Sequence, residues 1–230
     1  MRFANKIVLI TGAAGNLGRA AEAVFAAEGA ETILLDIKMD FLTSAYPGST
    51  ANRHLVAADL GNLDSVTSAL AQFPRIDIVC AIAGGFTMGE PVHGLSDAAW
   101  DQMLGINAIS MLNTMRAVVP RMIEAKFGKI VTIGAASAQR GPAYMSAYAA
   151  SKSIVMRLTE SMAAELKDQG INVNGVLPVT LDTPQNRAAM PDFDPRKFVT
   201  PTSIAEVMAF LASPAARDLN GVLIPVTGIN

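Results

Sequence analysis

The sequence predicts an α/β fold: one domain over residues 1–230, with a doubly wound parallel sheet of about seven strands and helices on both faces. Three observations predict it. Short apolar runs alternate with segments of helical periodicity along the whole chain, glycines stand where several of these runs stop, and no stretch resembles a linker between domains. Such alternation implies right-handed crossovers and a parallel sheet that is covered on both faces.

The predicted strands are short runs dominated by apolar residues. The first run, KIVLIT, breaks at Gly12, and an apolar run without alternation is typical of a strand buried on both faces. The later runs stop at an aspartate, at glycines or at a proline. We expect strands over residues 6–11, 32–36, 54–59, 76–85, 128–135, 171–178 and 221–227.

The segments between the strands are predicted to be helices. Asn62 is expected to cap one of them, and Ser146 to cap the helix that contains AYAASKSIVMRLTESMAAEL and stops at Gly170. Residues 179–200 contain three prolines and little periodicity, so we expect a loop there, with 181–200 closing over a substrate. The other helices are expected over residues 16–28, 63–73, 97–125 and 202–212.

The composition argues against several classes of protein. A net charge of −2 without basic clusters argues against nucleic acid or an anionic membrane as the main partner. The single cysteine, Cys80, rules out an internal disulfide, and no apolar span is long enough for a signal peptide or a transmembrane helix. His54 and His93 lack ligand spacing, so no metal site is expected. We therefore expect a cytoplasmic protein that acts on a small molecule.

A glycine-rich turn follows the first predicted strand. TGAAGNLG places Gly12, Gly15 and Gly18 between that strand and the next helix, where glycine permits positive φ and the close approach of a pyrophosphate. The helix that begins at Asn16 and Leu17 would offer free amides and the positive end of its dipole. These residues are predicted to bind a dinucleotide, and the competing interpretation is an ordinary glycine-rich turn.

Asp36 ends the second predicted strand, about twenty residues after the turn. Its carboxylate should accept hydrogen bonds from the adenosine ribose and repel a 2′-phosphate, so we expect NAD(H) over NADP(H). Arg19 keeps NADP(H) open, because a guanidinium there could bind that phosphate. Asp59 and Leu60 could frame the adenine, although Asp59 could equally be a helix-capping carboxylate.

Tyr148 and Lys152 stand four residues apart in a predicted helix, so the phenol and the ammonium share one face. A nearby ammonium favours the phenolate, and we expect it to lower the pKa of Tyr148 towards the range of a general acid. The competing interpretation is a surface tyrosine and lysine with this spacing by chance. The glycine turn upstream weighs against it.

Together, these motifs resemble the short-chain dehydrogenase/reductase superfamily over essentially the whole chain. TGAAGNLG resembles its cofactor turn, YAASK its catalytic YxxxK and PVTLDT its PGxxxT. The resemblance implies a Rossmann fold, an NAD(P)-dependent oxidoreductase, and a homodimer or homotetramer built on residues 97–125 and the helix of Tyr148. It further implies a proton donor in Tyr148, ribose contacts from Lys152, a water behind the lysine ordered by Asn107, and cofactor contacts from Ala83, Gly84, Pro178 and Thr183.

Departures from the family pattern narrow the prediction. The family's catalytic serine falls thirteen residues before the tyrosine, where this chain has Ala135, and Ser137 could replace it only if the loop bends differently. The runs CAIAGGF and VLPVTLDTPQNRAAMPDFD resemble dihydropteridine reductases, which also lack the serine. A planar conjugated acceptor should tolerate Ala135 better than a ketone does, because less charge builds up on one oxygen.

The leading hypothesis is therefore a reductase of a dihydropteridine-type acceptor. One alternative is an oxidoreductase of an unidentified carbonyl or alcohol that uses Ser137. The other is a redox sensor that binds a dinucleotide without turnover. Candidate substrate contacts are Asn186, Arg187 and Met190 on the loop, with Phe86 and Met88 as candidate pocket walls that are expected mainly in the core.

Overall fold

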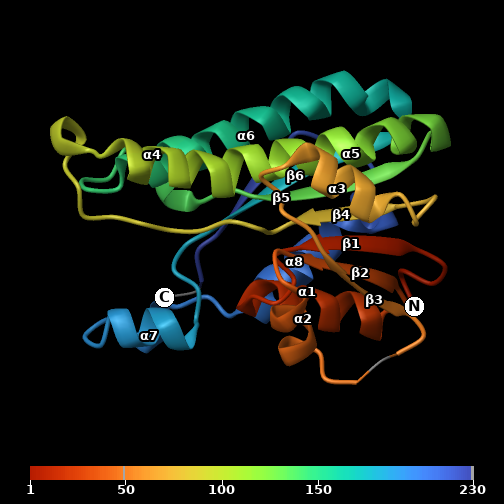
Figure 1. Ribbon diagram of the computed structural model, residues 1–230, viewed down its shortest axis with the longest axis horizontal. Coiled ribbons are helices and arrows are strands. Elements are labelled where there is room, and N and C mark those ends of the chain that lie inside the picture. Colours follow the sequence, from red (N-terminus) through yellow and green to blue (C-terminus); the bar gives the residue numbers. More distant parts are fainter. Residues whose placement is uncertain (49, 229–230) are drawn as a thin grey trace.

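The computed structural model describes residues 1–48 and 50–228 of the chain. A seven-stranded parallel sheet runs through it in the order β3-β2-β1-β4-β5-β6-β7, which confirms the predicted fold class (Figure 1). The strands are β1 Ile7–Thr11, β2 Glu31–Asp36, β3 Arg53–Ala57, β4 Ile78–Ala81, β5 Gly128–Ile133, β6 Ile171–Pro178 and β7 Leu223–Val226.

Two layers of helices cover the sheet (Figure 1). The layer of α1, α2 and α8 packs on one face, and the layer of α3, α4, α5 and α6 lies on the opposite face, while α7 projects beyond the sheet. The helices are α1 Asn16–Ala27, α2 Met39–Ala45, α3 Leu63–Leu70, α4 Asp97–Met103, α5 Ser110–Ala125, α6 Ser146–Leu166, α7 Pro184–Ala189 and α8 Pro201–Ala212. In the part of the chain that the structure describes, none of the helices combines the length and apolar character needed to cross a membrane.

The double covering explains why β1 is apolar without alternation. Val8 and Ile10 belong to the core under α1 and α8, whereas Leu9 belongs to the core under α3 and α5. All three side chains are fully buried. A strand between two helical layers is apolar at consecutive positions, as the run KIVLIT predicts.

The strand order reverses at β1, which lies between β2 and β4. Thr11 at the end of β1 is level with Leu35 on one side and Ala81 on the other. Because the connections after β1 and β4 turn to opposite faces, a crevice opens at the carboxyl ends of these strands. The Thr11 hydroxyl accepts hydrogen bonds from the amides of Ile82 and Ala83 (3.1 Å each) and fixes the chain where it leaves β4.

The helix expected over residues 97–125 is interrupted. α4 ends at Met103, a π-helical turn covers Leu104–Ile109, and α5 begins at Ser110. Asn107 lies in the π-helical turn and is buried. Turns of this kind are rare and concentrate at functional sites, and the helical periodicity of the sequence does not reveal the extra residue in the turn.

Two short helices, α2 and α7, differ from the expectation. α2 lies between β2 and β3, where no element is predicted, and α7 lies inside the expected loop of residues 179–200. Thr183 caps α7 by accepting from the Asn186 amide (3.1 Å), and Pro184 occupies its first turn. Both helices have seven residues or fewer, too few for periodicity to identify them.

The two predicted caps have different outcomes. Asn62 Oδ1 accepts from the Ser65 amide (3.1 Å), which confirms the cap of α3. Ser146 does not cap α6: Met145 holds the cap position, and the buried Ser146 hydroxyl has no hydrogen-bond partner among the described residues. The prediction was wrong because α6 begins one residue earlier than it assumes.

Candidate active site

The glycine turn between β1 and α1 is closely packed. Gly12 has φ of +65°, and a Cβ there would lie 2.8 Å from Cα of Ala83. A Cβ on Gly18 would lie 2.4 Å from the carbonyl oxygen of Gly12. Both positions therefore need glycine. The first amides of α1, at Asn16 and Leu17, have no intrahelical partner, so the turn and the helix start together suit a pyrophosphate.

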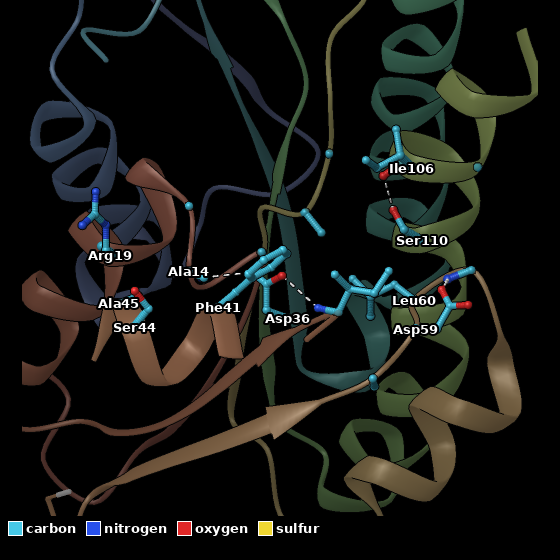
Figure 2. Close-up of a pocket in the computed structure, with 18 residues that line it drawn as sticks. Ala14, Arg19, Asp36, Phe41, Ser44, Ala45, Asp59, Leu60, Ile106 and Ser110 are labelled. Carbon is cyan, nitrogen blue, oxygen red and sulfur yellow. Dashed lines mark hydrogen bonds between the residues drawn. The ribbon is translucent and has the colours of Figure 1, made fainter. Parts of the chain in front are cut away.

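A cavity of about 800 Å³ opens beside this turn at the carboxyl edge of the sheet (Figure 2). Its walls come from the glycine turn, the end of β2, α2, the segment after β3, the chain after β4 and the π-helical turn. A cavity of this size beside a tight glycine turn fits a dinucleotide. Seven residues predicted to bind a cofactor line it: Gly12, Gly15, Asp36, Asp59, Leu60, Ala83 and Gly84.

Asp36 is held at the centre of the cavity wall (Figure 2). Its Oδ2 accepts from the amide of Ala14 (3.0 Å) and its Oδ1 from the amide of Ile37 (2.8 Å). Arg19 also lines the cavity, and its guanidinium donates to Oδ1 of Asn16 (2.9 Å). The cavity therefore contains both the carboxylate expected to favour NAD(H) and the guanidinium that keeps NADP(H) open.

Asp59 and Leu60 form the opposite wall of the cavity (Figure 2). Asp59 Oδ1 accepts from the amide of Gly61 (2.8 Å) in a local turn, and Asn62 caps the helix that follows. The interpretation of Asp59 as the helix cap was therefore wrong. The carbonyl oxygen of Leu60 accepts from the buried amide group of Asn113 on α5 (3.0 Å), which fixes the backbone of this wall.

Tyr148 and Lys152 lie one turn apart on α6 (Ser146–Leu166), and the Lys152 ammonium lies behind the cavity wall at Gly84. Lys152 is buried, and its ammonium donates to the carbonyl oxygen of Ile133 at the end of β5 (2.9 Å). A Cβ on Gly84 would lie only 3.1 Å from Lys152 Nζ. The absence of a side chain at Gly84 therefore brings the ammonium next to the cavity.

Burial controls the ionisation of both groups. It raises the pKa of Tyr148 to about 12 and lowers the pKa of Lys152 to about 8. The expectation that the ammonium lowers the pKa of Tyr148 was wrong for this structure, because the Lys152 ammonium donates to Ile133 and burial of the phenol raises its pKa. At pH 7 the phenol therefore keeps its proton, and most of the lysine is charged.

Asn107 connects three parts of the site. Its side-chain oxygen accepts from the amide of Gly85, and its nitrogen donates to the carbonyl of Gly85 and to the hydroxyl of Ser151 (3.1 Å each). Ser151 in turn donates to the carbonyl oxygen of Tyr148 (2.8 Å). Asn107 therefore fixes the chain beside the cavity and the first turns of α6 relative to each other. The Asn107 side chain hydrogen-bonds to Gly85, to Ser151 and to the sulfur of Met103 (3.8 Å), rather than to Lys152.

Ala135 stands where the family pattern has a serine, and its surroundings are apolar. It is buried in a cluster with Ala138, Met156 and Leu177, against which Tyr148 packs. Ser137 follows in a 3₁₀ turn, Ala136–Gln139, and is half-buried. Its hydroxyl makes no hydrogen bond to another described residue. The structure therefore places Ala135 in the apolar cluster against which Tyr148 packs.

Phe86 and Met88 are exposed, so the expectation that they belong to the core was wrong. They keep 56% and 57% of their surface accessible. The Phe86 ring meets the Tyr148 ring edge to face, with the ring centres 4.8 Å apart. The chain after β4 leaves the sheet at Ala81, four residues earlier than the expected end at 85, and carries both side chains outward. Phe86 is therefore an exposed aromatic side chain in contact with the Tyr148 ring.

The segment around α7 uses most of its polar side chains internally. The Asn186 amide donates to the carbonyl of Leu181 (2.9 Å), and Arg187 pairs with Asp182 (2.8 Å). The Thr183 hydroxyl is occupied as the cap of α7. These contacts differ from the predicted contacts of Asn186 and Arg187 with a substrate. Pro178 is buried at the end of β6, and Met190 is half-buried.

One contact connects the α7 segment to the glycine turn. The side chain of Asn16 donates to the side chain of Gln185 (3.1 Å), although the two residues are 169 positions apart in the chain. Gln185 therefore lies against the start of α1, although none of the described residues of 181–200 lines the cavity.

Sequence reasoning missed several residues of the cavity and the site. Ile37 and Gly61 directly follow predicted residues, so their position next to strand ends was a usable signal. Ser151 lies inside the YAASK motif, whose YxxxK pattern specifies only the tyrosine and the lysine. Phe41 and Ser44 lie on α2, and no motif marks them. The missed residues are Ala14, Ile37, Phe41, Ser44, Ala45, Ala58, Gly61, Gly105, Ile106, Ser110 and Ser151.

Comparisons with known proteins agree with this geometry. The profile of the short chain dehydrogenase family matches residues 6–193. The chain is 31% identical to an uncharacterized NAD-dependent oxidoreductase of Mycobacterium tuberculosis, over 96% of this chain and 94% of the relative. It is also 31% identical to a 3-oxoacyl-[acyl-carrier-protein] reductase of Thermotoga maritima, over 99% and 98% of the two chains.

Solved structures show the same architecture. The crystal structure of an NAD⁺-bound xylitol dehydrogenase covers all of this chain with a TM-score of 0.89 and 26% identity, and all of that chain is covered in return. The chain therefore belongs to the short-chain dehydrogenase family and is an oxidoreductase of that type.

Proposed function

We propose that the protein is an NAD(H)-dependent reductase in which Tyr148 donates a proton to the substrate. The observation that carries this proposal is the position of Tyr148 and Lys152 on α6, with the Lys152 ammonium against Gly84 in the wall of the dinucleotide-sized cavity. The bound cofactor would supply the hydride. The residues of the chain would orient the reactants and provide the proton.

The ionisation states support a reduction. A phenol with a pKa of about 12 is protonated at neutral pH and can donate. The Lys152 ammonium would hold the ribose of the cofactor and stabilise negative charge as Tyr148 gives up its proton. Asn107 would act by fixing the position of the chain at Gly85 relative to α6. Pro178 and Thr183 would contact the cofactor once the α7 segment closes.

Asp36 supports NAD(H) over NADP(H). Its carboxylate lies in the cavity, where it would accept from ribose hydroxyls and repel a 2′-phosphate. Arg19 is already hydrogen-bonded to Asn16, which reduces its availability for a phosphate. The relatives named as NAD-dependent and the NAD⁺-bound neighbour point in the same direction.

For the substrate, we propose a planar conjugated acceptor of the dihydropteridine type. Ala135 leaves the apolar side of Tyr148 without the hydroxyl donor that would stabilise an alkoxide. Phe86 offers an aromatic face next to the phenol, on which a flat ring could stack. The alternative is a carbonyl or alcohol substrate, which the names of relatives such as the 3-oxoacyl reductase support.

The test of this function compares turnover of quinonoid dihydropterin with turnover of a panel of ketones and alcohols, using NADH or NAD⁺. Tyr148→Phe should reduce kcat by about 10²–10⁴-fold with the preferred substrate, because it removes the general acid and keeps the ring. NADH affinity should stay unchanged, which serves as the control for folding. Brisk ketone reduction with an inert pterin would favour the alternative substrate. An unchanged kcat in Tyr148→Phe would reject the proposed role of Tyr148.

A further inference from the structure

Tyr46 directly follows α2 (Met39–Ala45) and is not among the residues that line the cavity. It is 6% exposed and belongs to the core under α1 and α8. Its hydroxyl donates to the carbonyl oxygen of Ala13 (2.7 Å), the residue that follows Gly12. No other described residue donates to that carbonyl. Tyr46 therefore satisfies a buried acceptor inside the turn itself.

The turn is held at each of its residues. The Ala13 amide donates to the carbonyl of Leu35 (3.2 Å), the Ala14 amide donates to Asp36 (3.0 Å), and the Gly15 amide donates to the carbonyl of Gly12 (3.1 Å). Among these contacts, the phenol of Tyr46 is the one that comes from a side chain outside the cavity lining. Its loss would release the turn without removing a group that faces the cavity.

A second set of contacts holds the Tyr46 ring. The guanidinium of Arg53 on β3 lies over the ring at 5.1 Å from its centre. Arg53 also donates twice to Oε1 of Glu22 on α1 (2.9 and 2.7 Å), and Glu22 is buried. Burial raises the pKa of the Tyr46 phenol, so the hydroxyl stays a donor. The network joins α1, α2 and β3 around the turn.

We propose that Tyr46 is a positioning residue for dinucleotide binding, which preorganises residues 12–15 through its bond to Ala13 and is itself held by the Arg53–Glu22 pair. The inference rests on the proposed dinucleotide binding. A turn that is already ordered binds without a further loss of conformational freedom. Without the hydroxyl, the buried carbonyl of Ala13 lacks a partner, and the turn relaxes until a ligand reorders it.

The test is Tyr46→Phe, with the dissociation constants of NADH and of ADP-ribose measured by titration calorimetry in the absence of substrate. Both constants should rise about tenfold, because the two ligands share the pyrophosphate. The kcat at saturating NADH should stay within about twofold, since Tyr46 does not touch the reacting groups. If Tyr46 had only a structural role, Tyr46→Phe would lower the melting temperature without weakening ligand binding more than it lowers kcat.

Ser213→Ala is the matched control. Ser213 is buried, and its hydroxyl donates to the carbonyl of Phe210 (2.7 Å) and accepts from the amide of Ala215 (3.3 Å), so its loss removes buried side-chain hydrogen bonds that do not involve the turn. It should leave both dissociation constants unchanged. If Tyr46→Phe does not fold, Arg53→Met provides the test. This variant keeps the phenol but removes the cation over the ring, and the dissociation constants of both ligands should rise about threefold.

The outcomes separate the two proposals. If the wild-type protein binds neither NADH nor ADP-ribose, the proposed function fails. If the wild type binds both and folded Tyr46→Phe binds them equally well, only the role of Tyr46 is rejected. Weakening by Ser213→Ala to the same extent would also reject it, because general destabilisation would then explain the effect.

Discussion

Lys152 is buried in surroundings that disfavour its charged form. The ammonium is buried, its hydrogen-bond partner is the neutral carbonyl of Ile133, and no carboxylate pairs with it among the described residues. Burial lowers its pKa from 10.5 to about 8. At about 1.4 kcal/mol for each pKa unit, this shift corresponds to a destabilisation of roughly 3 kcal/mol. A residue kept at such a cost is typical of a functional site.

Lys152→Met should therefore stabilise the fold while abolishing activity. Methionine fills similar volume without a charge, so the melting temperature should rise by a few degrees. The loss of the hydrogen bond to the Ile133 carbonyl reduces this gain but does not cancel it. The kcat should fall by at least about 10²-fold, because the charge that supports Tyr148 is gone. Calorimetry and steady-state kinetics check the two effects. A lower melting temperature would contradict the account of Lys152 as a strained buried cation.

The gain in stability should depend on pH with a defined sign. The folded state has the lower lysine pKa, so between about pH 8 and 10.5 the unfolded state binds more protons, and stability rises with pH. The penalty of Lys152 is complete below pH 8 and disappears above 10.5. The difference in the free energy of unfolding between Lys152→Met and wild type should therefore shrink across this window. A constant difference would show that the lysine titrates normally.

At the scale of elements, the π-helical turn Leu104–Ile109 connects two halves of the site. Asn107 lies in this turn and hydrogen-bonds to Gly85 in the chain after β4 and to Ser151 on α6 (Ser146–Leu166). The same turn supplies Gly105 and Ile106 to the cavity wall. An uninterrupted α-helix would place these residues in a different register, so the irregular turn is what lets one element serve both the cavity and α6.

Asn107→Ala should reduce both stability and turnover. The substitution leaves the Gly85 amide and carbonyl without their side-chain partner, which costs about 1–3 kcal/mol of folding free energy. The kcat should fall about tenfold or more, because the position of α6 loosens relative to the cavity wall. Chemical denaturation and steady-state kinetics measure the two effects.

Asn113→Ala is the matched control for Asn107→Ala. Asn113 is also a buried asparagine of the same helical segment, but its amide group supports Leu60 on the other wall of the cavity. It should raise the KM for NADH and leave kcat nearly unchanged. The same loss of kcat in both variants would show that Asn107 has no particular connection with Tyr148.

The sequence was sufficient for the elements whose residues repeat a simple pattern. The consecutive apolar residues of β1 and the glycines after it predicted both the sheet and the turn, because burial on two faces and tight packing each demand a residue type at a fixed position. The π-helical turn and α2 could not be predicted from the sequence, since neither changes the periodicity of a long segment. The direction of the pKa shift of Tyr148 could not be predicted either, because the burial of its side chain depends on the rest of the fold.

At the scale of the whole molecule, both helical layers that cover the sheet (Figure 1) carry exposed apolar side chains. The layer of α4, α5 and α6, with its π-helical turn, exposes Trp100, Ile109, Ile123 and Ile154 at 36–42%. A second copy of the chain that packs on this layer would cover these side chains. We therefore propose a dimer or a tetramer that uses this layer.

Ile154→Lys should weaken that assembly. A lysine ammonium in the middle of an apolar contact would lose its hydration without gaining a partner, so the dissociation constant of the oligomer should rise strongly. Light scattering coupled to gel filtration should then show the mass of one chain where the wild type shows two or four. Met39→Lys is the control, because Met39 is 41% exposed but lies on α2 in the opposite layer. A wild type that elutes as a single chain at every concentration would reject the assembly, and equal dissociation by Met39→Lys would place the interface elsewhere.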